Sequence, residues 1–262
     1  MQLREIFKLT TNNLYTILID ELRNFGYNRI TFQKKRKNYI AAEGDIPVVL
    51  VAHLDTVFDD AKTSREDMSI FYDQEKKVWW SPNGLGADDR VGVYMILKLL
   101  EETTLRPHII FTTGEETGGI GAFAVADDKN ILFDNVSYFI ELDRQGYKES
   151  VYYDCDNKDF EKYINSFGFK THDGTFTDIS IICPDWEICG VNLSVGYWWE
   201  HSYIEHFYEA AWKDTFKKLI MMLEDKAGYS TVWKYVERPF PMITEKELNL
   251  LKEQSKMGKV KK

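Results

Sequence analysis

The chain has 262 residues, of which 44% are hydrophobic and 15% aromatic, so it can bury the core of one large domain or of two small ones and is too apolar to be disordered. Its formal net charge of −9 and its pI of about 5.2 argue against a general nucleic-acid-binding surface, which has to be basic. Three cysteines without a C-x-x-C pair argue against a disulfide scaffold or a thiolate zinc site, and we expect reduced thiols.

The first 27 residues lack the uninterrupted apolar region and the small-residue cleavage site of a signal peptide. No apolar run approaches the ~20 residues that a membrane-spanning helix needs. We therefore expect a cytoplasmic protein that binds neither membranes nor nucleic acids.

The first half of the chain contains three recognisable patterns. Residues 3–25 have apolar positions at helical spacing and predict one or two amphipathic helices that end at Gly26. Residues 48–52 read as a buried strand, and residues 68–80 ("MSIFYDQEKKVWW") read as a hairpin because apolar residues alternate around a polar turn.

Buried helices and strands then alternate along the chain. The expected elements are an apolar helix at 90–102, a strand at 108–116, a helix at 119–126, strands at 136–143 and 190–201, and a long amphipathic helix at 203–228. This alternation predicts an α/β fold with a mostly parallel sheet covered by helices on both faces. We expect one domain over residues 1–243 and a lysine-rich, solvated tail over residues 244–262.

The predicted strands end in side chains that can bind metal ions. His53 and Asp55 follow the first strand; the other groups are Glu115 and Glu116, Glu141 and Asp143, and Glu200 and His201, with Asp88 and Asp89 just before a buried helix. Sites in open α/β sheets form at the carboxyl ends of the strands. Carboxylates gathered there repel one another and need cations, yet Arg90 and Arg144 are the only basic residues nearby. Divalent metal is the simplest compensation, and mixed His and carboxylate ligands suit zinc first, with cobalt or manganese as alternatives.

At this point the chain resembles a known group. The motifs "HLDT", "GADDRVG", "TTGEETGGIGA", "ELD" and "EHSYIE" occur in the order found in the co-catalytic di-zinc exopeptidases, which include di-zinc aminopeptidases, peptidase T, aminoacylase-like peptidases and glutamate carboxypeptidases. The resemblance covers residues 40–225, and five motifs in series make it specific.

The resemblance implies a role for each matching residue. The implied ligands of two zinc ions are His53, Asp88, Glu116, Asp143 and His201, with Asp88 bridging both ions and joined to Asp89 by a cis bond. Asp55 would hold His53, and Glu115 would be the general base that activates a zinc-bound water for attack on a peptide carbonyl.

Two of these assignments have competitors in the sequence. Glu141 lies two positions before Asp143 on the same side of a strand, so the two could exchange roles. His206 competes with His201, which we prefer because His206 falls within the predicted long helix.

Other residues have less support. Asp178 could equally well cap a helix or lie in the substrate pocket. The three aromatic residues before His201 could equally well form the wall of the pocket or fill the core; they are Tyr197, Trp198 and Trp199. We expect His108 and His172 at the surface, and Asp59 and Asp60 in a solvated loop.

The spacing between motifs leaves no room for the lid domain that many relatives carry, so we expect the catalytic domain alone. This architecture and the acidic pocket favour an aminopeptidase acting on peptides. A carboxypeptidase using Arg90 or Arg144, an N-acyl amino acid deacylase acting on acyl-amino-acid substrates, and a catalytically silent metal-stabilised binding protein are the alternatives. An oligomer is compatible with the sequence.

Overall fold

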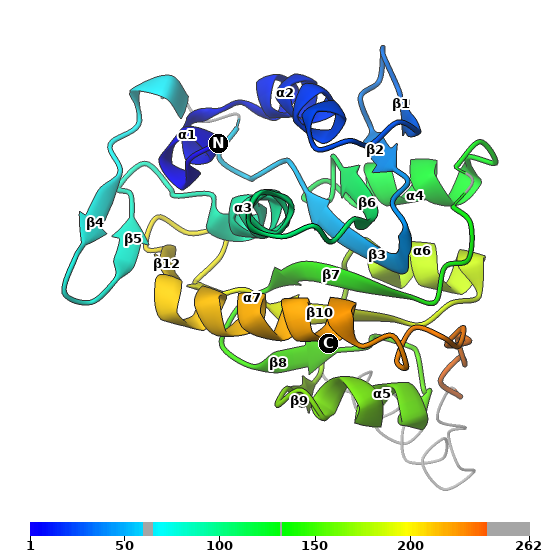
Figure 1. The fold of residues 1–262 in the computed structure, drawn as a ribbon. Coiled ribbons are helices and arrows are strands. Elements are labelled where there is room, and N and C mark those ends of the chain that lie inside the picture. Colours follow the sequence, from blue (N-terminus) through cyan, green and yellow to red (C-terminus); the bar gives the residue numbers. More distant parts are fainter. Residues whose placement is uncertain (60–64, 132, 240–262) are drawn as a thin grey trace, which may run out of the picture.

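A large mixed sheet forms the centre of the protein in the computed structural model, which describes residues 1–59, 65–131 and 133–239 (Figure 1). Its strand order is β1-β2-β6-β3-β7-β10-β8-β9. The strands are β1 (Ile30–Phe32), β2 (Tyr39–Ala42), β3 (Ile46–His53), β6 (Pro107–Thr112), β7 (Tyr138–Arg144), β8 (Glu149–Val151), β9 (Lys170–His172) and β10 (Gly190–Ser194).

The four central strands β6, β3, β7 and β10 are parallel, as the sequence predicts. The pairs β1–β2, β2–β6 and β10–β8 are antiparallel, whereas β9 runs parallel to β8. The register places His53 opposite Thr112 and Val51 opposite Glu141, so the strands that carry the predicted ligands end at one edge.

Helices cover both faces of this sheet (Figure 1). Alternate residues of β3 show the two faces: Val48 and Leu50 belong to one apolar cluster, and Val49 and Val51 to the other. The first cluster includes residues of α1 (Leu3–Lys8), α2 (Thr11–Asn24), α3 (Ala87–Glu102), α5 (Lys158–Asn165) and α7 (Glu209–Glu224). The second includes residues of α4 (Ile120–Asp127) and α6 (Ile179–Trp186). Strands buried on both faces are nearly continuous apolar runs, which is the pattern of β3.

The helix α3 packs directly against β7. A Cβ atom at Gly92 would lie 2.3 Å from the carbonyl oxygen of Leu142, so this contact requires glycine. Twelve of the sixteen residues of α3 are buried, including Asp88 and Asp89 at its start. The close packing fixes the beginning of α3 beside the carboxyl ends of the strands.

A smaller antiparallel sheet, in the order β11-β12-β5-β4, lies beside the main one. Its strands are β4 (Phe71–Asp73), β5 (Val78–Trp80), β11 (Tyr197–Trp198) and β12 (His206–Tyr208), and a short 3₁₀ helix, η1 (Arg65–Asp67), precedes it. The predicted hairpin is confirmed as β4–β5. The single strand predicted over 190–201 is wrong: the chain turns at Gly196, where φ is 89°, and β10 and β11 join different sheets.

Three further expectations are wrong. His206 lies on β12 rather than in α7. His108 is buried; its Nδ1 accepts a hydrogen bond from the Gly44 N–H at 3.1 Å, and its ring stacks on Phe133. Asp59 is not simply solvated, because it accepts hydrogen bonds from the N–H and hydroxyl of Thr11.

Other expectations are confirmed or lie outside the described residues. His172 is exposed on β9, and the three cysteines are free and buried. Asp60 and the predicted tail at 244–262 lie outside the described residues.

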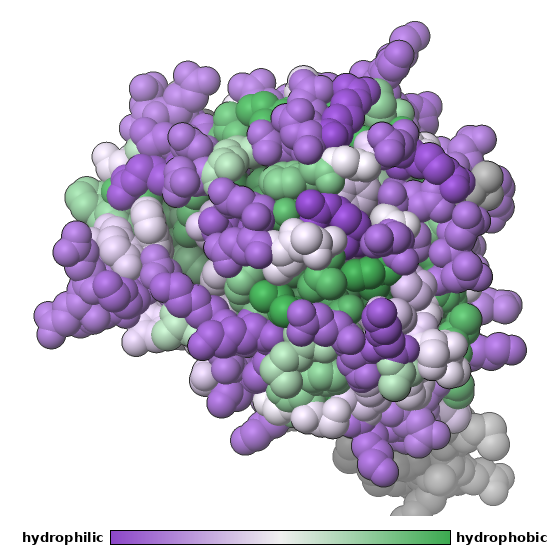
Figure 2. Space-filling model, viewed as in Figure 1, coloured by the Kyte–Doolittle hydropathy of each residue, from purple (hydrophilic) through white to green (hydrophobic). Residues whose placement is uncertain are grey.

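Among the helices that the structure describes, none combines the length and the hydrophobicity that crossing a membrane requires. The face in Figure 2 is mainly polar, with apolar side chains visible between the polar ones near its middle.

Candidate metal centre

Asp88 lies between two histidines, one on each of its carboxylate oxygens. Its Oδ1 lies 2.9 Å from Nε2 of His53, and its Oδ2 lies 3.2 Å from Nε2 of His201. Asp88 stands at the start of α3 after Gly86, whose φ of 68° turns the chain into the helix, and the Asp88–Asp89 peptide bond is cis. One carboxylate thus joins β3 to the loop between β11 and β12.

Two more carboxylates complete this arrangement. Oδ1 of Asp143, at the end of β7, lies 3.6 Å from Nε2 of His53. Oε2 of Glu116, in the loop after β6, lies 2.8 Å from Nε2 of His201. The five predicted ligands therefore form two neighbouring groups that share Asp88.

Ligand atoms of His53, Asp88 and Glu116 lie within 4.8 Å of one another, close enough to hold a metal ion together. This trio contains members of both groups. The structure thus brings together imidazole and carboxylate donors of the kind that divalent transition metals bind.

Asp55 connects His53 to the loop that carries Glu115 and Glu116. Its Oδ1 lies 3.5 Å from Nδ1 of His53 and accepts a hydrogen bond from the Gly114 N–H at 2.8 Å. The N–H groups of Glu115 and Glu116 also point at this carboxylate, at 3.4 and 3.2 Å. Asp55 therefore fixes the position of the loop as well as that of the histidine.

The site has far more negative than positive groups, and the pKa values reflect this. Burial, together with the charges of Asp143, Asp178 and Asp88, raises the pKa of Glu115 to about 8 despite His53. Burial and Asp88 likewise raise the pKa of Asp143 to about 7. Carboxylates with raised pKa values are short of compensating cations.

The histidines respond in the opposite direction. Hydrogen bonds to Asp88 and then Glu116 raise the pKa of His201 to about 11, and its side chain is 52% exposed, so it lies at the mouth of the site. Burial opposes charge on His53, but Asp143, Asp55 and Asp88 still raise its pKa well above the usual value.

Glu141 and His206, the competitors in the sequence, are placed differently. Both carboxylate oxygens of Glu141 are buried without a hydrogen-bond partner, and it makes no ion pair with His53 or His201 in the described structure. His206 stacks on Trp198, and its Nδ1 lies 3.1 Å from the Ile204 carbonyl oxygen. Neither residue belongs to the two ligand groups around Asp88.

Several residues around the ligands had weak or no sequence signals. Tyr197 donates a hydrogen bond to Oδ1 of Asp143 at 3.0 Å, and Thr177 donates one to Oδ2 at 3.1 Å. Asn192 on β10 accepts a hydrogen bond from the Asp143 N–H. Asp178 is buried and accepts a hydrogen bond from the Thr112 hydroxyl; its side chain caps no helix N–H. The only sequence signal for a position of Asp178 near the site was its place in the segment "GTFTD".

The aromatic residues before His201 separate. Tyr197 is buried and lines the site, Trp198 belongs to the small sheet, and Trp199 is 61% exposed. The cavity at the site has a volume of about 180 Å³, and its charged lining consists of Asp88, Glu115, Asp143, Arg144, Glu200 and His201.

Arg90 does not face this cavity. It is completely buried, and its Nη1 donates to the carbonyl oxygens of Ile6 and Leu9, while Nη2 lies 3.4 Å from Oδ1 of Asp59. Arg90 therefore anchors α1 against α3, and a substrate has no access to it.

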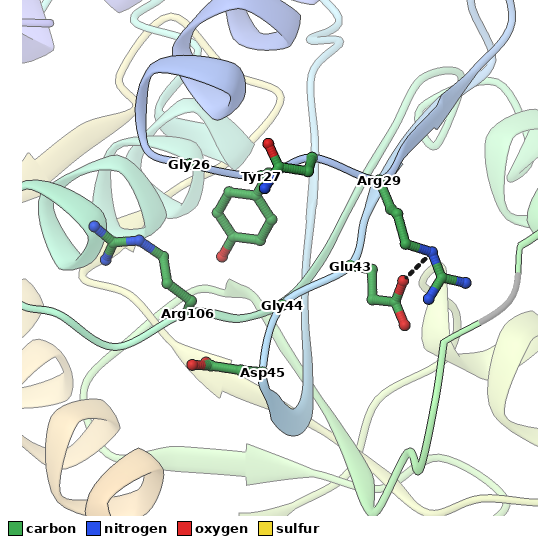
Figure 3. A pocket seen from close by; sticks show the side chains of 8 residues that line it. Gly26, Tyr27, Arg29, Glu43, Gly44, Asp45 and Arg106 are labelled. Atoms are coloured by element: carbon green, nitrogen blue, oxygen red, sulfur yellow. Dashed lines mark ion pairs between the residues drawn. The ribbon is translucent and has the colours of Figure 1, made fainter.

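A second cavity, of about 350 Å³, lies near the opposite ends of β3 and β6 (Figure 3). Its Arg29 pairs with Glu43 at 2.5 Å. Its Arg106 donates to the carbonyl oxygens of Phe25, Thr103 and Leu105. These contacts tie the ends of α2 and α3 to the sheet, and none of the predicted ligands lies there.

The fold has many solved counterparts. The chain is 14% identical to a tripeptidase from Staphylococcus aureus, with a TM-score of 0.69, covering 87% of this chain and 97% of the other. The aminopeptidase PepT from Bacillus cereus gives a TM-score of 0.69 at 14% identity, covering 86% and 97%. An aminopeptidase from the archaeon Desulfurococcus kamchatkensis gives 0.66 at 13% identity, covering 89% and 97%.

No curated protein is significantly similar to the chain in sequence. The model of peptidase family M28, however, matches residues 34–179, which is more than half of the chain. The match includes His53, Asp55, the Asp88–Asp89 pair, Glu115, Glu116 and Asp143, and it confirms the resemblance to the co-catalytic zinc exopeptidases. The chain belongs to peptidase family M28.

Proposed function

We propose that this peptidase is a metal-dependent aminopeptidase that uses two divalent ions, with Glu115 as the general base. The observation that carries the proposal is the position of Asp88, whose two oxygens face His53 and His201 at 2.9 and 3.2 Å. A carboxylate placed between two histidines in this way would be available to both ions.

The residues present fit two such ions. His53, Asp88 and Asp143 would hold one ion, and Asp88, Glu116 and His201 the other. Oε1 of Glu116 is buried without a hydrogen-bond partner, and Glu115 and Asp143 have raised pKa values, so the site has the acceptors and the negative charge that cations would satisfy. Zinc is the first choice for this donor set, with cobalt or manganese as alternatives.

When bound, the ions would polarise the scissile carbonyl and make a water acidic enough to attack near neutral pH. Glu115 lines the cavity beside Asp88 and Asp143. It would accept a proton from the attacking water and return it to the departing amine. Burial and the neighbouring carboxylates raise the pKa of Glu115 to about 8, so they favour a proton on this side chain.

Other side chains would keep the proposed ligands in position. Asp55 would fix the tautomer and orientation of His53, and it holds the Glu115–Glu116 backbone. Tyr197 and Thr177 occupy both oxygens of Asp143 and so restrict the rotation of this carboxylate.

Aminopeptidase specificity has two sources of support. The acidic cavity suits a free α-amino group, and two of the structures described above are named as aminopeptidases. The carboxypeptidase alternative loses one of its candidates, because Arg90 is buried and bonded to backbone carbonyls. A catalytically silent protein is disfavoured because each proposed ligand and the base are present.

The test is metal content together with hydrolysis of alanine p-nitroanilide, with and without a chelator. We expect two zinc ions per chain and hydrolysis that stops on chelation and returns with zinc. An absence of bound metal together with an absence of hydrolysis of amino-terminal substrates would refute the proposal.

A further inference from the structure

We infer that Arg144 binds the C-terminal carboxylate of the substrate, which makes the natural substrates short peptides with free C-termini. The inference rests on the proposed aminopeptidase function and adds the substrate class. It starts from the charge pattern of the cavity, in which Arg144 is the one lysine or arginine among the described lining residues.

The guanidinium of Arg144 is hydrogen-bonded to the protein through Nε, and its two Nη atoms are available to a ligand. Its Nε donates a hydrogen bond to Oε2 of Glu149 at 2.9 Å, and the described structure gives Nη1 and Nη2 no protein partner. Glu149 is itself fixed, because its N–H donates to the Ser194 hydroxyl at 3.0 Å. A guanidinium oriented in this way can present two parallel N–H groups to a carboxylate.

The position of Arg144 connects it to the reaction. It directly follows Asp143, and both side chains line the same cavity with Glu115. The rest of the charged lining is acidic apart from His201 and would repel a substrate carboxylate. Within this cavity, Arg144 is therefore the place where such a group is accommodated.

The size of the cavity limits the length of the peptide. Its volume of about 180 Å³ is below the roughly 300 Å³ at which ligand pockets of ordinary size begin. A scissile carbonyl beside Glu115 and a carboxylate at Arg144 leave room for only one or two residues after the cleaved bond. In a longer peptide the C-terminus would lie outside the cavity, beyond the reach of this guanidinium.

The kinetic test compares trialanine with trialanine amide, which differ only in the terminal charge. The wild-type enzyme should prefer the acid in kcat/KM by roughly ten- to a hundredfold, the range for a charged hydrogen-bonded pair. Arg144→Gln should lose this preference, because kcat/KM should fall for the acid and much less for the amide. In the wild-type enzyme, the preference in kcat/KM for the acid over the amide should be smaller for hexaalanine than for trialanine.

Two variants separate charge recognition from structural damage. Glu149→Gln removes the same ion pair but keeps the guanidinium, so it should still prefer the acid. Arg23→Gln removes an arginine whose side chain is 56% exposed and pairs with Asp20 of the same helix, and it should behave as wild type. The inference would be overturned if Arg144→Gln lowered kcat/KM equally for trialanine and its amide. It would also be overturned if this variant still preferred the acid.

A binding measurement gives an answer that does not depend on turnover. Trialanine should bind zinc-loaded Glu115→Gln protein more tightly than its amide does, by calorimetry, and adding Arg144→Gln should equalise the two. Equal binding before Arg144 is changed would refute the inference. A wild-type protein that binds the acid preferentially but hydrolyses no aminoacyl substrate would instead refute the proposed function and leave the inference standing.

Discussion

Glu205 holds the backbone of Asp88 from 117 positions further along the chain: its Oε1 accepts a hydrogen bond from the Asp88 N–H at 3.1 Å. Its Oε2 accepts a second one from the Gly86 N–H. Glu205 is almost completely buried, and burial together with the charge of Asp88 raises its pKa to about 8 despite these hydrogen bonds. The loop that carries His201 is in this way tied to the start of α3, where the proposed bridging ligand lies.

This contact predicts the effect of Glu205→Ala. The change leaves two buried backbone N–H groups without an acceptor, which costs about 2–6 kcal/mol of unfolding free energy at 1–3 kcal/mol each. Because Asp88 would lose its support, zinc affinity should also fall by about 10–100-fold. Urea unfolding and zinc titration measure both. Glu75→Gln, on an exposed turn, is the control and should change neither quantity.

Glu115→Gln should separate metal binding from catalysis. Glutamine has the same shape but cannot accept the proton, so kcat should fall by about 10²–10⁴-fold. Metal content, measured by mass spectrometry, should stay at the wild-type value because Glu115 belongs to neither ligand group. Full activity in this variant would show that another residue is the base.

Asp143→Asn and Glu141→Gln decide which carboxylate of β7 is the ligand. Asp143 lies 3.6 Å from His53, so Asp143→Asn should weaken the binding of one ion and leave the other. Burial and Asp143 raise the pKa of Glu141 well above the usual value, and both its oxygens lack partners, so a neutral glutamine should be tolerated there. Metal stoichiometry is the readout, and a loss confined to Glu141→Gln would reverse the assignment.

His108 should make the fold less stable in acid. Its Nδ1 accepts the Gly44 N–H and its Nε2 lies 3.3 Å from the Asp134 carbonyl oxygen, an arrangement that suits the neutral ring. Burial lowers its pKa, more than the Asp134 carbonyl and nearby carboxylates raise it. A lowered histidine pKa means that the unfolded chain takes up protons first, so stability is full above about pH 6.5 and falls as the pH drops below it.

The measurement is the unfolding free energy of metal-free protein at pH 7.5 and 5.5, for wild type and His108→Gln. The variant has no ring to protonate, so wild type should lose more stability on acidification than the variant does. The other titrating groups are common to both proteins and cancel in the difference. Equal losses would contradict the neutral, hydrogen-bonded state of this ring.

Local patterns were sufficient for much of the fold. The structure confirms the strand predicted from the apolar run of β3, the helices predicted from the helical spacing in α2 and α7, and the hairpin predicted from the alternation in β4–β5. Each kind of burial leaves its own period of apolar residues in the sequence. Local patterns could not separate β10 from β11, since the turn at Gly196 interrupts an apolar stretch without changing its composition.

The candidate site divides in a similar way. The sequence by itself predicted the candidate ligands, because metal-binding side chains at successive strand ends form a pattern that a parallel sheet brings to one edge. Their individual roles, including that of Glu115 as the base, were implied by the resemblance to the di-zinc exopeptidases. The sequence also determined the family motifs that residues 34–179 carry.

Only the tertiary structure decided how these residues meet. It places the two oxygens of Asp88 between His53 and His201, buries Arg90 away from the cavity, and leaves Arg144 beside Asp143 with its outer edge available. It also places Glu205 under Asp88, across 117 positions. These relations depend on side-chain direction and on contacts between distant segments, which residue spacing along the chain does not record.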